Sequence, residues 1–516
     1  MQMNKAPIMG KTIMVQGTTS HAGKSLMTAA LCRIFAQDGL RVAPFKAQNM
    51  SLNSFVTPDG GEFGRAQAVQ AEAARIAPTV EMNPILLKPE GNRKSQVVVM
   101  GKPTRVASAR EYYEMKLRLW PLVTQALDTL RSRYDIVVIE GAGSPAEINL
   151  REHEIVNMRV ARYANAPVII VGDIDRGGVF ASLVGTMALL EPEEQALVKA
   201  FVINKFRGDP SLLDSGFDIL RERTGVGVAG VVPWFDDIHI PEEDSLGLDP
   251  PRAWNNSQSD DFIDIAVVRL PRIANFDDFD PLYREERVRL RYVNNASEMG
   301  APDLIILPGS KTTVADLEWM RQSGIADAVT ARRCAGTPVI GVCGGYQMLG
   351  ERILDPDGVE STVQETRGLG LLPLTTTFAA TKTTHQVRGK VAASSAGMLA
   401  GNGGSAIAGY EIHMGQTYDN GDGKSGAPFR ITERSGKSVN SSDGAMDADG
   451  LTLGTYMHGL FHNHSLRHTL LTNIARRKGI ALPDGAILDL DAEYDKLAAL
   501  IRHSVDMDAV YAMVGL

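Results

Sequence analysis

The sequence predicts an α/β protein with two parallel-sheet domains in succession. Short apolar runs rich in β-branched residues alternate with helical patterns in each half, and a segment rich in Pro, Asp, Asn and Ser separates the halves. A chain of 516 residues is also too long for one ordinary hydrophobic core. We therefore expect an N-terminal domain over 1–245, a linker over 246–262, a second domain over 263–465 and a helical segment over 466–516.

The composition narrows the class of protein. A hydrophobic content of 44% with 22% charged residues is typical of a soluble globular chain. The net charge of -8 argues against a general nucleic-acid binder, and no apolar stretch approaches the roughly 20 residues of a membrane helix. Three cysteines without metal-ligand spacing favour a reducing compartment. We expect a cytoplasmic protein that binds neither nucleic acid nor membrane.

In the N-terminal half, strands and helices are expected to alternate. "TIMVQ" is the first strand, the helix after it ends near Gly39, and "RVAPF" is the next strand. The runs "YDIVVIEGAG", "APVIIVGDID" and "KAFVINKFRGD" follow, each ending in small or polar residues. Such alternation implies a mostly parallel sheet, whose ligands gather at the carboxyl ends of the strands.

The segment "GTTSHAGKS", residues 17–25, looks like a phosphate-binding loop, but Gly17 and Gly23 enclose five residues where the usual loop has four. Its glycines would let backbone N–H groups converge on phosphate oxygens. Lys24 would reach the β- and γ-phosphates, and Ser25 would bind Mg²⁺. The alternative is a glycine-containing turn with an exposed lysine. The strand before the loop and the helix after it favour the nucleotide site.

This spacing resembles the loop of the dethiobiotin synthetase-like branch of P-loop proteins, whose members activate carboxylates with ATP. The resemblance implies that Glu140, at the end of "VVIE", is a metal-binding carboxylate and that Glu62 is a second magnesium ligand. It also implies that Lys46 lies near the phosphates or the substrate and that Asn204 contacts the base of ATP. Each of these residues could instead cap a helix, form a turn or lie on the surface.

A second alternation of strands and helices follows the linker, with "IDIAVVRLP", "DLIILPGSK" and "TPVIGVCGGYQML" as strands. From about 390 to 450 the chain is rich in Gly, Ser and Asp, which favours loops and antiparallel edge strands. The tail after residue 465 has helical patterns.

The third of these strands leads into a G-x-C-x-G motif centred on Cys343. A strained turn between strand and helix would project this thiol at a helix N-terminus, where the helix dipole favours a thiolate. The N–H of Gly344 would form one half of an oxyanion hole, and Gly309 or Ser310 of "LPGSKTT" would supply the other. A small cysteine buried for packing is the alternative, which the flanking glycines disfavour.

A nucleophilic thiol needs a base, and His458 in "LTLGTYMHGLFHN" is the best candidate. Residues 262–465 resemble the class I glutamine amidotransferase domains, in which the cysteine attacks the side-chain amide of glutamine and releases ammonia. That family's usual third member, a glutamate two residues after the histidine, is replaced here by Leu460. Glu411 and His413 are candidate helpers, equally compatible with a polar structural network, and a Cys–His dyad is the remaining alternative.

A dethiobiotin synthetase-like half followed by an amidotransferase half without that glutamate resembles the glutamine-dependent enzymes of cobalamin synthesis. "GTTSHAGKS", "KAQNMSLNS", "NPILLKP" and "LPGSKTTVADLEW" are similar to the cobyric acid synthase family. The resemblance implies use of ATP, Mg²⁺ and L-glutamine, and amidation of a corrinoid, adenosylcobyrinic acid a,c-diamide, at side chains b, d, e and g. The alternatives are cobyrinic acid a,c-diamide synthase or another ATP-dependent amidoligase and, more distantly, a partitioning-type P-loop switch ATPase.

Overall fold

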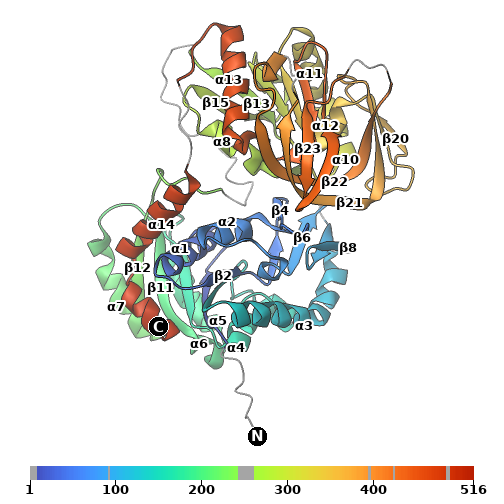
Figure 1. Ribbon diagram of the computed structural model, residues 1–516. Helices are drawn as coiled ribbons and strands as arrows, with labels where there is room; N and C mark the ends of the chain where they lie inside the picture. The colour runs from blue at the N-terminus through green and yellow to red at the C-terminus, as the bar shows by residue number, and fades with distance from the viewer. Residues whose placement is uncertain (1–8, 91–92, 242–260, 393–396, 422–424, 484–488) are drawn as a thin grey trace.

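A computed structural model describes residues 9–90, 93–241, 261–392, 397–421, 425–483 and 489–516 of the chain. These residues form two α/β domains stacked on each other, with the N-terminal domain at the bottom of Figure 1. The predicted linker, residues 246–262, lies outside the described residues except at its last two positions. The predicted fold class, two parallel-sheet α/β domains in succession, is confirmed.

The N-terminal domain is built on a parallel sheet in the order β12-β11-β10-β1-β9-β2. Its strands are β1 (Lys11–Gly17), β2 (Val42–Phe45), β9 (Ile136–Glu140), β10 (Val168–Asp173), β11 (Val198–Phe206) and β12 (Val228–Pro233). Alternate residues of β9 point to opposite faces, so that Val137 and Ile139 pack on one side and Ile136 and Val138 on the other. The central strands β9 and β10 are therefore apolar up to the carboxylates at their ends, Glu140 and Asp173, as a sheet covered on both faces requires.

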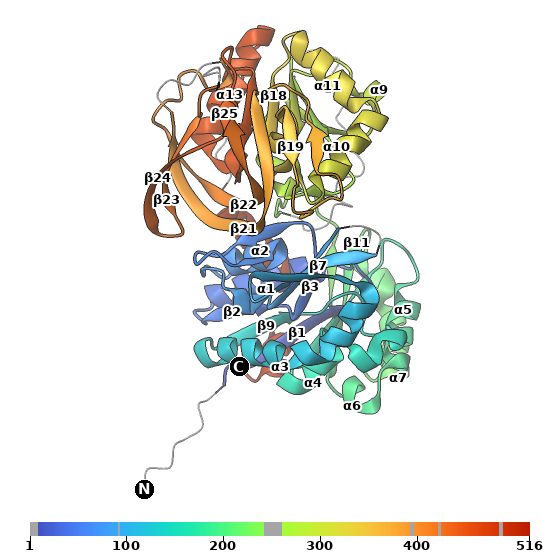
Figure 2. The same cartoon turned by 90° about the vertical axis from the view of Figure 1, so that its right-hand side faces the viewer.

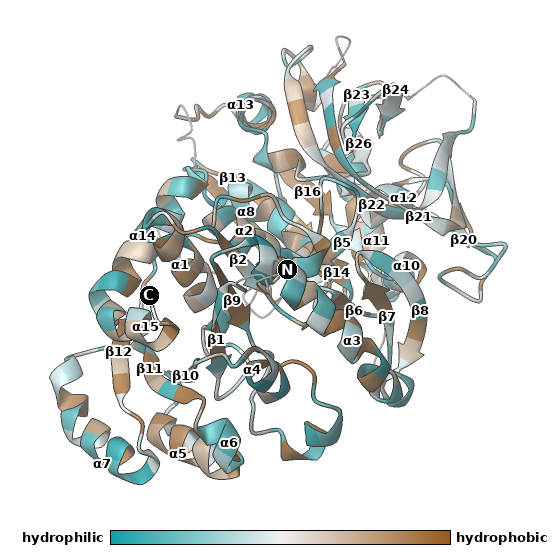
Figure 3. Ribbon diagram, turned by 60° about the horizontal axis from the view of Figure 1, so that its bottom comes forward, coloured by the Kyte–Doolittle hydropathy of each residue, from teal (hydrophilic) through white to brown (hydrophobic). Residues whose placement is uncertain are grey.

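Helices cover both faces of this sheet. One face carries α3 (Ala109–Arg133), α4 (Met158–Ala164), α5 (Val179–Leu189) and α7 (Asp214–Thr224). The other carries α1 (Lys24–Gln37) together with α14 (Leu490–Ser504) and α15 (Met507–Val514) from the end of the chain. In Figure 3 strand β9 is brown, that is apolar, whereas the helices α6 (Pro192–Gln195) and α7 at the lower edge carry teal, polar residues. Among the described residues, none of the helices is long and apolar enough to cross a membrane.

The C-terminal helical segment is divided between the two domains. Helix α13 (His464–Lys478) packs on the second domain, whereas α14 returns to the first, as the red helices of Figure 1 show. Arg33 of α1 fixes α14 through ion pairs with Asp491 (3.0 Å) and Asp495 (2.7 Å). The two domains are thus joined by the tail as well as by the linker.

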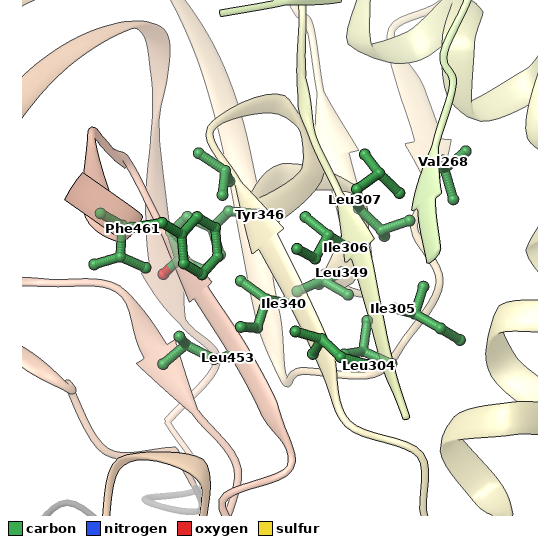
Figure 4. Packing of buried hydrophobic residues seen from close by; sticks show 14 of the residues in the cluster. Val268, Leu304, Ile305, Ile306, Leu307, Ile340, Tyr346, Leu349, Leu453 and Phe461 are labelled. Atoms are coloured by element: carbon green, nitrogen blue, oxygen red, sulfur yellow. The ribbon is translucent and has the colours of Figure 1, made fainter. Parts of the chain in front are cut away.

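The second domain contains a sheet in the order β15-β13-β16-β18-β26-β25, parallel except for the pair β25–β26. Its strands are β13 (Ile263–Val268), β15 (Val288–Val293), β16 (Leu304–Leu307), β18 (Val339–Val342), β25 (Ala445–Met446) and β26 (Thr452–Thr455). Its main helices are α10 (Thr313–Gln322), α11 (Ile325–Cys334) and α12 (Gly344–Leu349). Figure 4 shows Ile306 and Ile340 of neighbouring strands packed beside Leu349 of α12 in the core.

A largely antiparallel sheet lies beside this core, in agreement with the expectation for residues 390–450. Its elements are β19 (Arg352–Leu354), β20 (Glu365–Arg367), β21 (Leu374–Val391), β22 (Ala406–Asp419), β23 (Phe429–Arg434), β24 (Lys437–Asp443) and β27 (Met457–His458). The long strand β21 begins before the stretch in which antiparallel strands were expected.

Two small sheets of the N-terminal domain lie at the boundary with the second domain; Figure 2 labels β3 and β7 of the first, and Figure 1 labels β4 of the second. One is β3-β6-β7-β8, with strands β3 (Gln48–Met50), β6 (Ile85–Pro89), β7 (Lys94–Val99) and β8 (Lys102–Ser108). The other pairs β4 (Ser54–Val56) with β5 (Glu62–Gly64), and β4 contacts β21 and β22. Helix α2 (Arg65–Ala73) follows β5 directly, so the segment from β3 to α2 lies at the interface of the two domains.

Candidate active sites

The predicted phosphate-binding loop connects β1 to α1. Gly23 has φ 105°, and a Cβ atom there would lie 2.0 Å from Nδ2 of Asn204, so only glycine fits. Lys24 is the first residue of α1, and its Nζ donates hydrogen bonds to the carbonyl oxygens of Thr19 (2.8 Å) and Gly143 (3.0 Å). The lysine is therefore held against the loop at the positive end of α1, where phosphate groups bind.

Glu140 ends β9 beside this loop and is buried. One of its carboxylate oxygens, Oε1, accepts hydrogen bonds from Ser25 Oγ (2.8 Å) and Lys46 Nζ (2.8 Å), and Gln70 Nε2 donates to Oε2 (2.5 Å). Burial would raise the pKa of Glu140, but Lys46 and these donors hold it below its usual range. An ionised carboxylate next to a hydroxyl suits Mg²⁺, which binds few protein oxygens together with substrate phosphates. Ser25 and Glu140 therefore fit a magnesium ion.

Glu62 and Asn204 have other partners in the structure. The buried Glu62 accepts hydrogen bonds from Lys88 (2.7 Å) and from Lys382 of the second domain (2.5 Å), whose charges lower its pKa against the opposing effect of burial. Asn204 Nδ2 donates to the carbonyl oxygen of Ala22 (2.8 Å) and so supports the phosphate-binding loop. Magnesium binding by Glu62 and base recognition by Asn204 stay predictions.

Cys343 forms a strained elbow between β18 and α12. Its φ of 51° and ψ of -106° are rare for a non-glycine residue, and such strain often marks a functional side chain. The flanking glycines allow the close approach of neighbouring backbone, because a Cβ on Gly345 would lie 2.0 Å from the carbonyl oxygen of Leu307. The thiol of Cys343 donates a hydrogen bond to the carbonyl oxygen of Ile412 (3.6 Å).

Replacing Gly345 with alanine is expected to destabilise the protein by about 1–3 kcal/mol, because the added methyl group overpacks a site closed by backbone. Differential scanning calorimetry measures the effect. The matched control is Gly185→Ala in α5, where an added Cβ meets nothing within 4 Å. That control is expected to be neutral or to stabilise by about 0.5–1 kcal/mol. An unchanged melting temperature for Gly345→Ala would contradict the steric explanation of the motif.

Asp278 orients His458. Its Oδ2 lies 2.7 Å from His458 Nδ1, and its Oδ1 accepts a 2.7 Å hydrogen bond from the N–H of Gly459. Burial would lower the pKa of His458, but the Asp278 charge, the hydrogen bond to Asp278 and the neighbouring Cys343 raise it to about 10. Asp278, absent from the sequence-based predictions, thus takes the place of the missing glutamate.

The two candidate helpers have structural partners instead. Glu411 accepts a pair of hydrogen bonds from Arg434, at 2.8 and 2.9 Å. The ring of His413 stacks on Tyr456 with centroids 3.7 Å apart, and burial lowers its pKa to about 4. Both residues therefore belong to the polar structural network and do not orient His458.

The segment β17 (Gly309–Ser310) lies against the elbow, as predicted for an oxyanion hole. A Cβ on Gly344 would lie 2.8 Å from the nitrogen of Ser310, and one on Gly309 would lie 3.1 Å from Cε1 of His458. The structure thus brings Gly309 and Gly344 together with Cys343 and His458.

A cavity of about 1060 Å³ opens from this site toward the N-terminal domain. Cys343 and His458 line its second-domain side, with Gln347 and Glu360 of the same domain. Residues of the first domain that line it are Lys88, Glu90, Gln96 and Arg105. Burial raises the pKa of Glu360 to about 7. One cavity therefore connects the nucleophile to the domain that carries the phosphate-binding loop.

Together, these sites define a nucleotide-binding P-loop domain fused to a cysteine-dependent glutamine amidotransferase domain. Comparison with known families agrees: residues 13–246 match the CobQ/CobB/MinD/ParA nucleotide binding domain, and residues 264–466 match the CobB/CobQ-like glutamine amidotransferase domain.

Curated relatives extend over nearly the whole chain. Cobyric acid synthase of Sorangium cellulosum is 53% identical, covering 98% of this chain and 99% of its own. Cobyric acid synthase of Dehalococcoides mccartyi strain BAV1 is 52% identical with the same coverage, and that of Moorella thermoacetica is 49% identical over 98% of each chain. The chain belongs to the cobyric acid synthase family, whose members are ligases with a glutamine amidotransferase domain.

Proposed function

We propose that the chain uses ATP and L-glutamine to amidate adenosylcobyrinic acid a,c-diamide at side chains b, d, e and g, giving adenosylcobyric acid. The full-length similarity to cobyric acid synthases supports the product. The observation that carries the coupled reaction is the cavity lined by Cys343 and His458 on one side and by Lys88 and Gln96 on the other. Ammonia formed at the thiol would be released next to strands β6 and β7 of the synthetase domain.

In the amidotransferase half, the thiolate of Cys343 attacks the side-chain amide carbon of glutamine. The N–H groups of Gly344 and of the Gly309 segment would stabilise the oxyanion. His458, oriented by Asp278, gives its proton to the leaving nitrogen, so that ammonia departs and a glutamyl thioester remains. Water then hydrolyses the thioester to glutamate.

In the synthetase half, a substrate carboxylate oxygen attacks the γ-phosphorus of ATP, and ADP leaves. Backbone N–H groups between Gly17 and Gly23 and the Lys24 ammonium would hold the phosphates, while Lys46 would face the transferred group. Magnesium bound by Ser25 and Glu140, with Glu62 as a further predicted ligand, would neutralise phosphate charge. Ammonia then attacks the acyl phosphate, and phosphate leaves as the amide forms.

Mass spectrometry tests the substrate. With ATP, Mg²⁺, glutamine and adenosylcobyrinic acid a,c-diamide, we expect new amides at b, d, e and g, because the chain is similar to cobyric acid synthases throughout its length. New amides at a and c from unamidated cobyrinic acid would support the a,c-diamide synthase alternative. ATP hydrolysis without glutamine consumption would contradict both and favour a switch ATPase.

A further inference from the structure

The short helix that carries Asp278 is held by a side chain of the other domain. This helix is η5 (Phe276–Phe279), and its Asp277 lies next to Asp278. Nε of Arg65, the first residue of α2 in the synthetase domain, lies 3.0 Å from Oδ2 of Asp277. Both side chains are buried. They form an ion pair whose geometry is not that of a hydrogen bond. Breaking a buried ion pair is costly, because each charge then lies in the protein interior without an opposite charge beside it.

A second contact fixes the beginning of η5. The N–H of Phe276 donates to Oδ1 of Asn53 (3.2 Å), and the N–H of Ser54 donates to Oδ1 of Asn275 (3.1 Å). These reciprocal bonds cross the domain boundary at the start of β4. The position of Asp278 is therefore set by groups of the synthetase domain as well as by its own fold.

Arg65 is itself held in place from its own domain. Its guanidinium lies over the ring of Phe55, 5.0 Å from the centroid, and its Nη1 lies 3.4 Å from Glu72 Oε1. Burial raises the pKa of Asp277, and the Arg65 charge opposes that effect. Contacts within the synthetase domain thus orient Arg65, and the bonds at the start of η5 orient Asp277.

Helix α2 also contacts the nucleotide site. Gln70, on the turn of α2 that follows Arg65, donates to Glu140 Oε2 (2.5 Å), and Glu140 in turn accepts from Ser25 of the phosphate-binding loop. The first residue of α2 therefore contacts Asp277, the neighbour of Asp278, and the middle of the same helix contacts Glu140 beside the phosphate-binding loop. A rigid, packed helix can couple two sites energetically when it has two alternative positions that both sites influence.

We propose that Arg65 is a positioning residue for the glutaminase site, acting on Cys343 through Asp277, Asp278 and His458, and that α2 links glutamine hydrolysis to the nucleotide site. The inference rests on the proposed function for the identity of the two sites. It adds that the glutaminase site is complete only when docked on the synthetase domain. Arg65 touches neither glutamine nor the thiol in this scheme.

A double-mutant cycle with Arg65→Gln, Asp277→Asn and the double variant tests the proposal in the full chain. Each single variant is expected to lower the glutaminase kcat on the order of 10- to 100-fold with an unchanged KM for glutamine. Alkylation of Cys343 by iodoacetamide, followed on its peptide by mass spectrometry, is expected to slow in parallel. The double variant should lose no more than either single one, because both act through one contact.

The nucleotide link is measured as the ratio of Cys343 alkylation rates with and without the ATP analogue AMP-PNP and Mg²⁺. This ratio should differ from one in the wild type and approach one in Arg65→Gln. The matched control is Arg75→Gln, since Arg75 follows the same helix and pairs with Asp491 on the surface. We expect it to retain wild-type values.

The proposal would be overturned by wild-type kcat in folded Arg65→Gln, by additive losses in the double variant, or by a wild-type alkylation ratio of one. Equal loss of ammonia-dependent synthesis and glutaminase would also overturn it, because that outcome indicates a purely structural role. Should Arg65→Gln not fold, Arg65→Lys keeps the charge without the planar fork and is expected to show a partial loss of kcat. Failure to amidate the corrinoid would refute the proposed function separately, since glutaminase is assayed without it.

Discussion

Replacing Cys343 with serine is expected to abolish glutamine-dependent synthesis while ammonia-dependent synthesis continues. The variant lacks the thiolate that attacks glutamine, and loss of a catalytic nucleophile lowers kcat by about 10⁴- to 10⁶-fold. Added ammonia bypasses this step, because it attacks the acyl phosphate in the other domain. Synthesis is measured once with glutamine and once with ammonium chloride as the nitrogen source.

Cys334→Ser is the matched control for this experiment. Cys334 is an exposed thiol at the end of α11 and does not belong to the elbow. The Cys334→Ser variant should therefore keep the wild-type rate in both assays. Equal loss of both activities in a folded Cys343→Ser variant would contradict the scheme of two separate sites joined by a cavity.

The fold could be predicted from the sequence because periodic patterns encode it locally. The apolar run Ile136–Glu140 is a strand whose neighbours pair in parallel, and the helix after the phosphate-binding loop ends at Gln37, just before the expected Gly39. The elbow at Cys343 was predictable for the same reason, since its glycines and its thiol lie within five consecutive residues.

The partners of these residues could not be predicted, because they are distant in the sequence. Asp278 lies 180 residues before His458 in a short 3₁₀ turn, and the acidic stretch around it has no periodicity that singles out one carboxylate. The ion pair between Glu62 and Lys382 joins residues 320 apart. Such contacts depend on how the domains dock, and a local pattern carries no information about docking. The C-terminal tail was predicted to be helical, but its division between two domains was not.

Replacing Asp278 with asparagine is expected to lower the glutaminase kcat by about 10²- to 10⁴-fold with little change in the KM for glutamine. Asparagine has the same shape and keeps an oxygen for the N–H of Gly459, but it lacks the charge that raises the pKa of His458 to about 10. Burial then dominates and lowers that pKa, so His458 is neutral at pH 7 and no longer stabilises a thiolate. Alkylation of Cys343 by iodoacetamide at pH 7 should therefore slow in parallel with the loss of glutaminase.

Glu411→Gln separates the loss of orientation from the loss of any buried carboxylate. Glu411 is as buried as Asp278 but pairs with Arg434, so its replacement should lower the melting temperature without slowing Cys343 alkylation at pH 7. Ammonia-dependent synthesis should survive in both variants, because neither carboxylate belongs to the synthetase site. Wild-type glutaminase in a folded Asp278→Asn variant would mean that Cys343 and His458 work as a dyad. The hydrogen bond from Asp278 would then serve the fold and not the reaction.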